Sequence, residues 1–447
     1  MTMMQWERLL SDKRVGMEHY HQPKQSAQPW ERTDFERDYD RMVFSSPFRR
    51  LQNKAQVFPL AGNIFVHNRL THSLEVSCVG RSLGNNITRG LKARYGELPW
   101  ESGAISAIVS AACLAHDMGN PPFGHSGERA ISAYFREGKG RVWEDAVRKE
   151  GGRWEDFLHF EGNANAFRLL THQFEGRRKG GFALTYSTVA SIVKYPYSSE
   201  MAGKAGKFGF FATEEDTFLM IAEELGMLCR NEHPVKYARY PLVYLVEAAD
   251  DICYQIMDIE DAYKLRILTY AETENLFLAF CPEEELGHMR GVLDHITDAN
   301  EQIAYLRSRV ISLLVESCTR VFLDHEDEIL SGTFSGTLIG AMEPRLKEAY
   351  GACARMAYSK IYVARDVVDV ELAGHQIFGA LIDKMMQALT NPDHAYSRTL
   401  LSRVSTQYNI REESLYGKIQ CTLDYISGMT DIYALDLYRK ITGMNLR

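Results

Sequence analysis

The chain has 447 residues, of which 45% are apolar and 25% charged, and its 59 acidic and 51 basic residues give a formal net charge of −8 at pH 7. This balance is typical of a globular protein and excludes a disordered chain, and the acidic excess argues against a protein that coats nucleic acid. The longest nearly apolar stretch, residues 104–115, is too short to cross a bilayer, and no signal core begins the sequence, so we expect a cytoplasmic protein without a membrane partner.

The pattern along the chain is almost entirely helical. Residues 1–45 are polar and charged, and we expect them to wrap the surface of the folded protein. Beyond them, apolar residues recur at spacings of three and four in six long stretches, namely 70–88, 102–116, 214–230, 240–268, 295–325 and 366–390. Three Gly-rich or basic stretches, residues 138–153, 175–181 and 203–209, are expected to be loops.

These patterns predict an all-α protein with few or no strands. No Pro- or Ser-rich linker divides the chain, so we expect a wrapping segment (1–45), a helical core (46–330) and a C-terminal helical subdomain packed on that core (331–447). The stretch 203–209 lacks the spacing of a Walker A loop, which argues against a P-loop NTPase. The eight cysteines contain no CxxC pair, so we expect most of them to be reduced and buried.

Two predicted helices carry histidines on their apolar faces. His72 shares a face with residues at helical offsets of 4, 7, 11 and 15, which are Val76, Val79, Leu83 and Ile87. His116 continues the face of Ile105, Ile108 and Ala112. Asp117 follows it directly, before a rigid loop, residues 119–125, that contains two prolines and a second histidine. Both imidazoles are therefore expected to point inward.

A third helix places carboxylates in an apolar setting. Asp250, Tyr254 and Asp258 are spaced i, i+4 and i+8, so they share one face of the predicted helix 240–268. An unpaired buried carboxylate is costly, so such a group needs a cation, a hydrogen-bond network or a metal. Two imidazoles and two carboxylates on helices that can pack together form a plausible site for a divalent transition metal.

The order of these residues, H…HD…D, resembles the HD superfamily of metal-dependent phosphohydrolases. Six strings in order are similar to the bacterial deoxyguanosine triphosphate triphosphohydrolases (dGTPases), and they span nearly the whole chain: RRLQNKAQVFPL, NRLTHSLEVSCVGRSLG, AHDMGNPPFGHSGE, FEGNANAFRLL, EAADDICYQIMDIEDA and YISGMTDIYALDLYRKITG. The resemblance implies an HD-domain helical bundle with additional C-terminal helices. It also implies a metal-dependent enzyme that cleaves a dNTP, most simply dGTP, into deoxynucleoside and tripolyphosphate.

The resemblance assigns roles to particular residues. The metal ligands would be His72, His116, Asp117 and Asp250. They would hold Mn²⁺ or Mg²⁺, with Fe²⁺, Zn²⁺, Co²⁺ and Ni²⁺ as alternatives. The catalytic pair would be His125 and Glu128, and the histidine would either protonate the leaving 5′ oxygen or position the attacking water. Substrate contacts would come from a wider set: Gln56, Arg69, Asn120, Glu161, Lys194, Tyr254 and Asp258.

Four weaker expectations complete this set. Glu371 could accept from the ring N–H of guanine, and residues 177–179 could reach the triphosphate or an activating nucleotide, or lie in a solvated loop. A dNTP or single-stranded DNA would be the effector. Relatives form homo-oligomers, commonly hexamers, and three C-terminal tyrosines could form such an interface or lie in the core: Tyr425, Tyr433 and Tyr438.

Two other functions remain open on the sequence. One is a different HD phosphohydrolase, such as a nucleotide monophosphatase or a phosphodiesterase. A cyclic-di-nucleotide phosphodiesterase is disfavoured, because the Gly-Tyr-Pro motif it should carry is replaced here by Lys194-Tyr-Pro. The other is a nucleotide- or DNA-binding module without activity, which would be expected to have lost a metal ligand or His125, and all of these positions are filled.

Overall fold

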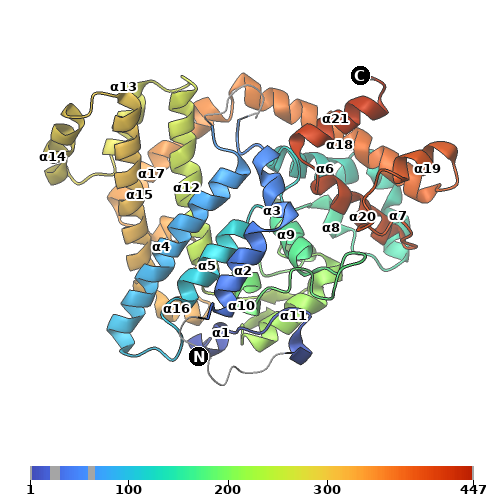
Figure 1. The fold of residues 1–447 in the computed structure, drawn as a ribbon, viewed down its shortest axis with the longest axis horizontal. Coiled ribbons are helices and arrows are strands. Elements are labelled where there is room, and N and C mark those ends of the chain that lie inside the picture. The colour runs from blue at the N-terminus through green and yellow to red at the C-terminus, as the bar shows by residue number, and fades with distance from the viewer. Residues whose placement is uncertain (1–2, 21–30, 59–65, 445–447) are drawn as a thin grey trace.

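The computed structural model describes residues 3–20, 31–58 and 66–444, and these residues form an all-α protein (Figure 1). Within them the only paired strands are a short antiparallel ribbon, β1 (Cys229–Asn231) and β2 (Lys236–Tyr237). The expected fold class is therefore confirmed. No helix in the described residues is long and apolar enough to span a membrane.

The helices divide into two series along the chain. Those before the ribbon are α1 (Trp6–Leu9), α2 (Asp34–Val43), α3 (Ser46–Arg50), α4 (Arg69–Tyr95), α5 (Ala104–Ala115), α6 (His125–Arg136), α7 (Glu144–Lys149), α8 (Glu155–Leu158), α9 (Gly162–Thr171), α10 (Tyr186–Ala190) and α11 (Glu215–Glu224). Those after it are α12 (Val243–Lys264), α13 (Tyr270–Leu278), α14 (Glu283–Asp294), α15 (Ala299–Asp324), α16 (Glu326–Leu330), α17 (Pro344–Met356), α18 (Arg365–Thr390), α19 (Ala395–Leu401), α20 (Leu415–Ser427) and α21 (Asp431–Ile441). Single turns of tighter or wider helix connect them: η1 (Glu18–Tyr20), η2 (Leu51–Asn53), η3 (Lys139–Trp143), η4 (Ser199–Met201), η5 (Gly203–Ala205), η6 (Ala212–Glu214), η7 (Ile339–Ala341) and η8 (Ala357–Ile361).

Helices α4, α5 and α12 form the centre of the molecule, and α15 packs beside α4 and α12 (Figure 1). Helix α4 begins with a capping box, in which Asn68 Oδ1 accepts the Thr71 N–H at 3.0 Å. Two glycines let α4 approach α5 closely, because a Cβ on Gly84 would lie 2.6 Å from the Ser106 Cα and one on Gly80 would lie 2.5 Å from the Cys113 Sγ. The apolar residues that share a face with the predicted inward histidines are all buried.

The apolar interior consists of two clusters. The larger contains α4, α5, α12 and α15 and extends along the chain to Ile361. The smaller joins α6 and α8 to the C-terminal helices α18–α21, which gather together at one end of the molecule (Figure 1). Residues 377–437 thus share a core with residues 130–160. Of the three C-terminal tyrosines, Tyr425 is buried in this cluster and Tyr433 and Tyr438 pack partly buried against it.

Several expected boundaries differ from the observed ones. The stretch 138–153 was expected to be a loop, but η3 and α7 occupy it, because Val147 supplies an apolar anchor that is fully buried. The expected helix 214–230 ends at Glu224 and the chain turns at Gly226 (φ 67°) into β1. Within the N-terminal segment, α2 lies against α5 and buries Phe35 and Met42.

Candidate active site

Three helices bring two imidazoles and a carboxylate to one point. His72 comes from the first turn of α4, His116 caps the C-terminus of α5, and Asp250 comes from the middle of α12. Asp250 Oδ1 lies 3.0 Å from His72 Nε2 and 3.4 Å from His116 Nε2, and all three ligand atoms are within 4.8 Å of one another. The spacing and the donor types suit a divalent metal ion.

The protonation pattern of His116 supports a ligand role. Its Nδ1 lies 2.6 Å from the Cys113 carbonyl oxygen, which can only accept, so the proton is on Nδ1. Its Nε2 is buried without a hydrogen-bond partner among the described residues. An inward-facing imidazole nitrogen whose tautomer is fixed by a carbonyl is the usual arrangement of a metal-binding histidine. Burial alone would lower the pKa of His116, but the Asp117 and Asp250 carboxylates raise it to about 9, and the same negative field would attract a cation.

Asp117, the fourth expected ligand, lies next to this cluster and is held by neighbours. The Asp117 Oδ2 lies 3.7 Å from His116 Nε2 and accepts a hydrogen bond from Arg69 Nη1 at 2.7 Å. The other carboxylate oxygen, Oδ1, accepts a hydrogen bond from the Asn120 side-chain amide. Burial raises the pKa of Asp117, but the Arg69 guanidinium and the two histidines outweigh this and lower it. The structure thus brings Arg69 and Asn120, two expected substrate contacts, onto a metal-ligand candidate.

The loop that follows Asp117 has a fixed and unusual backbone. Phe123 (φ 61°) and Gly124 (φ 56°) both have positive φ, and α6 starts immediately afterwards at His125. Close packing requires Gly119, because a Cβ there would lie 2.1 Å from the Ala166 N. A conformation that is unfavourable for Phe123 persists because surrounding groups hold it.

Two polar side chains from distant segments hold this loop. Lys54 Nζ donates to the Asn120 carbonyl oxygen at 2.5 Å and to the Ser427 carbonyl oxygen at 2.8 Å. Asp431, at the start of α21, accepts the Phe123 N–H at 3.0 Å and the Ala55 N–H at 2.8 Å. Both side chains are buried, so these bonds satisfy backbone groups that water cannot reach. The C-terminal helices therefore contribute directly to the geometry of the loop that carries His125.

His125 and Glu128 form the pair expected from the sequence. The His125 Nδ1 lies 2.7 Å from Glu128 Oε2, and the Glu128 Oε1 accepts the Gly162 N–H at 2.8 Å. The Glu128 carboxylate raises the pKa of His125, and burial opposes it. Burial alone would raise the pKa of Glu128, but the charges of His125 and Lys207 outweigh the effect of burial and lower this pKa to about 2. With Nδ1 bonded to Glu128, the His125 Nε2 is the nitrogen left to act on a substrate.

Lys207 is a functional candidate that the sequence analysis missed. Its Nζ lies 2.9 Å from Glu161 Oε1 and 3.8 Å from Glu128 Oε2, and it faces the same cavity. Glu161, an expected substrate contact, also caps α9 by accepting the Asn163 N–H at 2.6 Å. Lys207 lies in the stretch 203–209, and its spacing carries no signal beyond the rejected Walker A pattern.

These groups line an open cavity of about 390 Å³. Its lining includes most of the expected site residues, namely Gln56, Arg69, His116, Asp117, Asn120, His125, Glu128, Glu161, Lys194, Asp250 and Tyr254. Gln56 Oε1 and Arg69 Nε are buried without partners among the described residues and are free to bind a ligand. Lys194 pairs with Glu247 at 3.2 Å, and this carboxylate raises its pKa although burial would lower it.

Three expected contacts lie away from the cavity wall. Asp258 sits behind Tyr254 and accepts from the Tyr362 hydroxyl at 2.8 Å, and burial raises its pKa to about 8. Glu371 forms an ion pair with Arg129 at 2.9 Å and is not part of the lining. Arg177 lines a different cavity.

Comparison with known proteins agrees with this geometry. A model of the HD domain matches residues 69–262, and a model of the phosphohydrolase-associated domain matches residues 340–440. The fold and the His-His-Asp cluster define a metal-dependent HD-domain phosphohydrolase.

Three relatives place the chain more closely. It is 38% identical to a deoxyguanosinetriphosphate triphosphohydrolase-like protein of Synechocystis sp., over 99% of this chain and all of that protein. It is 37% identical to a protein of the same description from Pseudomonas aeruginosa, over 98% of this chain and 99% of the relative. It is 30% identical to the deoxyguanosinetriphosphate triphosphohydrolase of Salmonella typhimurium, over 92% of this chain and 94% of the relative. The chain belongs to this family of dGTPases and dGTPase-like hydrolases, as its sequence motifs predict.

Proposed function

We propose that the protein is a dNTP triphosphohydrolase that acts first of all on dGTP, and that it releases deoxyguanosine and tripolyphosphate. The observation that carries this proposal is that His116 and Asp250 of the His-His-Asp cluster line the same cavity as the His125–Glu128 pair, together with three cationic side chains. Arg69, Lys194 and Lys207 supply positive charge along the cavity for a triphosphate. The relatives' names support the choice of nucleotide.

The metal would be held by His72, His116 and Asp250, with Asp117 as a fourth ligand once it is released from Arg69 or shared with it. When bound, a divalent cation supplies positive charge beside the phosphate oxygens at the reacting centre. We propose Mn²⁺ or Mg²⁺. The choice is tested by metal analysis of the purified protein and by restoring activity to metal-free protein with each ion.

The chain's own residues account for the remaining steps. Water attacks the α-phosphorus and gives up a proton to solvent, and the bond from that phosphorus to the 5′ oxygen breaks. The 5′ oxygen leaves as an alkoxide, which is a poor leaving group at neutral pH and needs a proton. His125 Nε2 donates that proton, because Glu128 raises the pKa of the imidazole and favours its protonated form. Glu128 is held by the Gly162 N–H and so fixes the ring orientation.

Sugar selection would come from the aromatic wall of the cavity. Tyr254 lines the cavity and stacks on Tyr362, with ring centroids 6.2 Å apart and planes at 23°. A ring held in this way has little freedom to move aside for a 2′-hydroxyl. Asp258 supports this ring indirectly, by accepting a hydrogen bond from the Tyr362 hydroxyl.

The test is a product analysis. The purified protein is incubated with Mn²⁺ or Mg²⁺ and with each dNTP separately, and GTP is included as the ribonucleotide control. Phosphorus NMR should show tripolyphosphate with free deoxynucleoside, fastest for dGTP. Orthophosphate or pyrophosphate would identify a different HD phosphohydrolase. Absence of turnover with every dNTP, alone and mixed, and with single-stranded DNA added, would favour a binding protein.

The assembly is a separate part of the proposal. We propose a homo-oligomer, with a hexamer as the first expectation, and a dNTP or single-stranded DNA as an effector. Light scattering of the purified protein measures the assembly, and the same NMR assay with and without a second dNTP or an oligonucleotide measures activation.

A further inference from the structure

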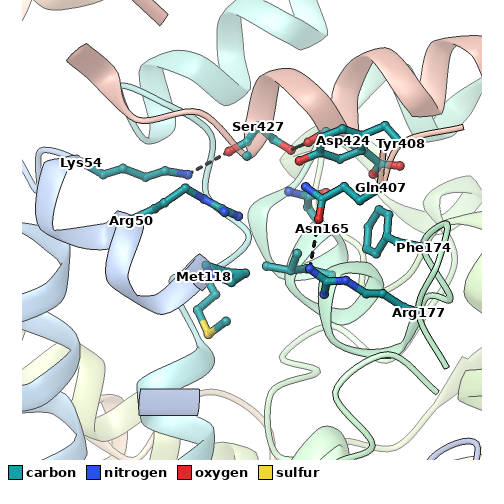
Figure 2. Close-up of a pocket in the computed structure, with 13 residues that line it drawn as sticks. Arg50, Lys54, Met118, Asn165, Phe174, Arg177, Gln407, Tyr408, Asp424 and Ser427 are labelled. Carbon is teal, nitrogen blue, oxygen red and sulfur yellow. Dashed lines mark hydrogen bonds between the residues drawn. The ribbon is translucent and has the colours of Figure 1, made fainter. Parts of the chain in front are cut away.

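A second, narrow cavity is lined by Met118, the residue that follows Asp117, and Figure 2 shows the side chains that surround it. It is bounded by α3 and η2, by residues 165–177, by residues 407–408, and by the end of α20. Its lining is unusually cationic and contains Arg50, Lys54 and Arg177. Two aromatic rings, Phe174 and Tyr408, complete the wall beside Arg177 (Figure 2).

Arg50 is the most informative of these groups. Its side chain is half-buried, and it forms no hydrogen bond and no ion pair with any of the residues in 3–20, 31–58 and 66–444. Burial lowers its pKa, the Tyr408 phenol raises it, and the neighbouring Arg177 lowers it, so no carboxylate compensates its charge. A guanidinium withdrawn from water without an anionic partner is unfavourable unless a ligand supplies the anion.

Arg177 reinforces this positive field. Its Nη2 donates to Gln407 Oε1 at 3.0 Å and its guanidinium carbon lies 5.9 Å from the centre of the Phe174 ring, and neither partner carries a charge. Figure 2 shows Arg50 and Arg177 directed toward the same space from opposite sides. Two guanidiniums that converge without a shared carboxylate repel each other, and an anion between them would reverse that interaction.

The one carboxylate in the wall does not neutralise these arginines. Asp424 accepts from Arg168 in a bidentate pair, with both distances 2.8 Å, so its charge is matched by an arginine outside the cavity lining. Lys54 adds less to the positive field, because it is buried, donates to two carbonyl oxygens and has the Asp431 carboxylate nearby. Burial is the main cause that lowers the pKa of Lys54, to about 7, and an anion nearby would raise it again.

We propose that this cavity binds a single phosphate group, with Arg50 and Arg177 as its ligands. The phosphate can belong to free phosphate, to a polyphosphate or to a nucleotide, since all three present the same tetrahedral anion to a pair of guanidiniums. The narrowness of the cavity favours a single phosphate group over a nucleic-acid strand.

The cavity is joined to the active-site loop by two hydrogen bonds. Lys54 Nζ donates to the Asn120 carbonyl oxygen, and Asn165 Nδ2 donates to the Gly119 carbonyl oxygen at 2.6 Å. Both donors line the second cavity, and both acceptors lie between Asp117 and His125. Occupation of the cavity therefore acts on the backbone that places the catalytic pair. This coupling rests on the proposed function, whereas binding of the anion does not.

Binding is tested by calorimetry with inorganic phosphate, tripolyphosphate and GTP as separate probes. The background is Lys194→Gln, which weakens anion binding in the active site. Arg50→Gln and Arg177→Gln should each weaken the remaining binding by about tenfold or more, as expected for loss of a charge-assisted hydrogen bond. Arg49→Gln and Arg178→Gln are matched controls, because both side chains are exposed and neither lines the cavity, so they should leave binding unchanged.

The outcomes separate the sources of the anion. Tight binding of phosphate alone, of tripolyphosphate or of GTP identifies which molecule supplies the group. No binding of any of the three, or binding that is equal in Arg50→Gln and Arg49→Gln, would overturn the proposal. Binding of a single-stranded oligonucleotide, without binding of phosphate, tripolyphosphate or GTP, would also overturn the proposal. Arg50→Lys keeps the charge but loses the planar fork, and it should retain weakened binding if Arg50→Gln proves unstable.

The coupling is measured in the protein with an intact active site. If the cavity is occupied during turnover, Arg50→Gln should change the rate of dGTP hydrolysis while the metal content stays at the wild-type level. Phosphate binding that depends on Arg50 without any effect on the rate would retain the site and reject the coupling. If the wild-type protein hydrolyses no dGTP at all, the proposed function is wrong, but the result of the binding experiment still stands.

Discussion

The two sides of the active-site cavity are built in different ways. On one side, the metal-ligand candidates come from long helices whose own periodicity aims His72, His116 and Asp250 inward. On the other side, His125 follows a loop with positive φ at Phe123, and contacts from distant parts of the chain hold that loop. We therefore expect that affinity for a metal and alignment of the His125–Glu128 pair can be disturbed separately by mutation.

The largest effect is expected on the helical side. Asp250→Ala removes the carboxylate that both histidines face, so metal content and hydrolysis should both fall to the detection limit. Metal analysis and the product assay measure the two quantities on the same preparation. Near wild-type hydrolysis with full metal content would rule out this cluster as the metal centre.

His125→Ala should separate the two sides. The rate should fall by about 10²–10⁴-fold, because the leaving oxygen loses its proton donor. Metal content and substrate affinity should stay close to those of the wild type, since His125 is not part of the metal cluster. Loss of metal together with the rate would show that the two sides are not independent.

A smaller effect is expected when the support of the loop is altered. Asp431→Asn keeps one acceptor oxygen but cannot serve both the Phe123 and the Ala55 N–H groups, so the loop should shift. We expect kcat to fall by about 10–100-fold with unchanged metal content. Asp436→Asn is the control, because that residue lies on the same helix and pairs at the surface with Lys440. Equal kcat values for the two variants would remove Asp431 from the positioning of the loop.

The smallest effect is expected in the pH profile of Glu128→Gln. In the wild type, the Glu128 carboxylate raises the pKa of His125, so the histidine stays protonated to a higher pH. Without that charge the pKa of His125 falls, and the alkaline limb of the kcat profile should move to lower pH along with the loss of rate. If His125 instead accepts a proton from the attacking water, the acidic limb should be the one that moves.

The same contrast decides how much the sequence could predict. The helices that carry the metal cluster were predictable, because their apolar spacing is local and extends over several turns. The family motifs also predicted the His125–Glu128 pair. Lys207 and Asp431 were not predicted, because their roles depend on contacts between segments far apart in the chain, such as the bond that joins Asp431 to a residue 308 positions earlier. Local spacing carries no trace of such a contact.

Charge balance was also hidden from the sequence. Arg177 was expected to lie either in a solvated loop or near the triphosphate, and it lies instead in the second cavity, half-buried against Phe174. Nothing in the run of residues 45–54 distinguishes Arg50, which lacks a partner, from Arg49, which is exposed. The two arginines differ only in the folded protein, where four segments of the chain pack around the second cavity and Arg50 alone lines it.

The contacts of Lys54 and Asp431 have a consequence for the order in which the protein is made. A ribosome synthesises the His125 loop about 300 residues before the Ser427 carbonyl and the Asp431 carboxylate that complete its support. A growing chain can fold the central helices early and assemble the metal ligands once α12 has emerged. The loop that carries His125 gains its last supports only when nearly all of these residues have been synthesised. Alignment of His125 is thus expected to be the final event of synthesis, and chains broken off early would contain the His72–His116–Asp250 cluster without an aligned His125.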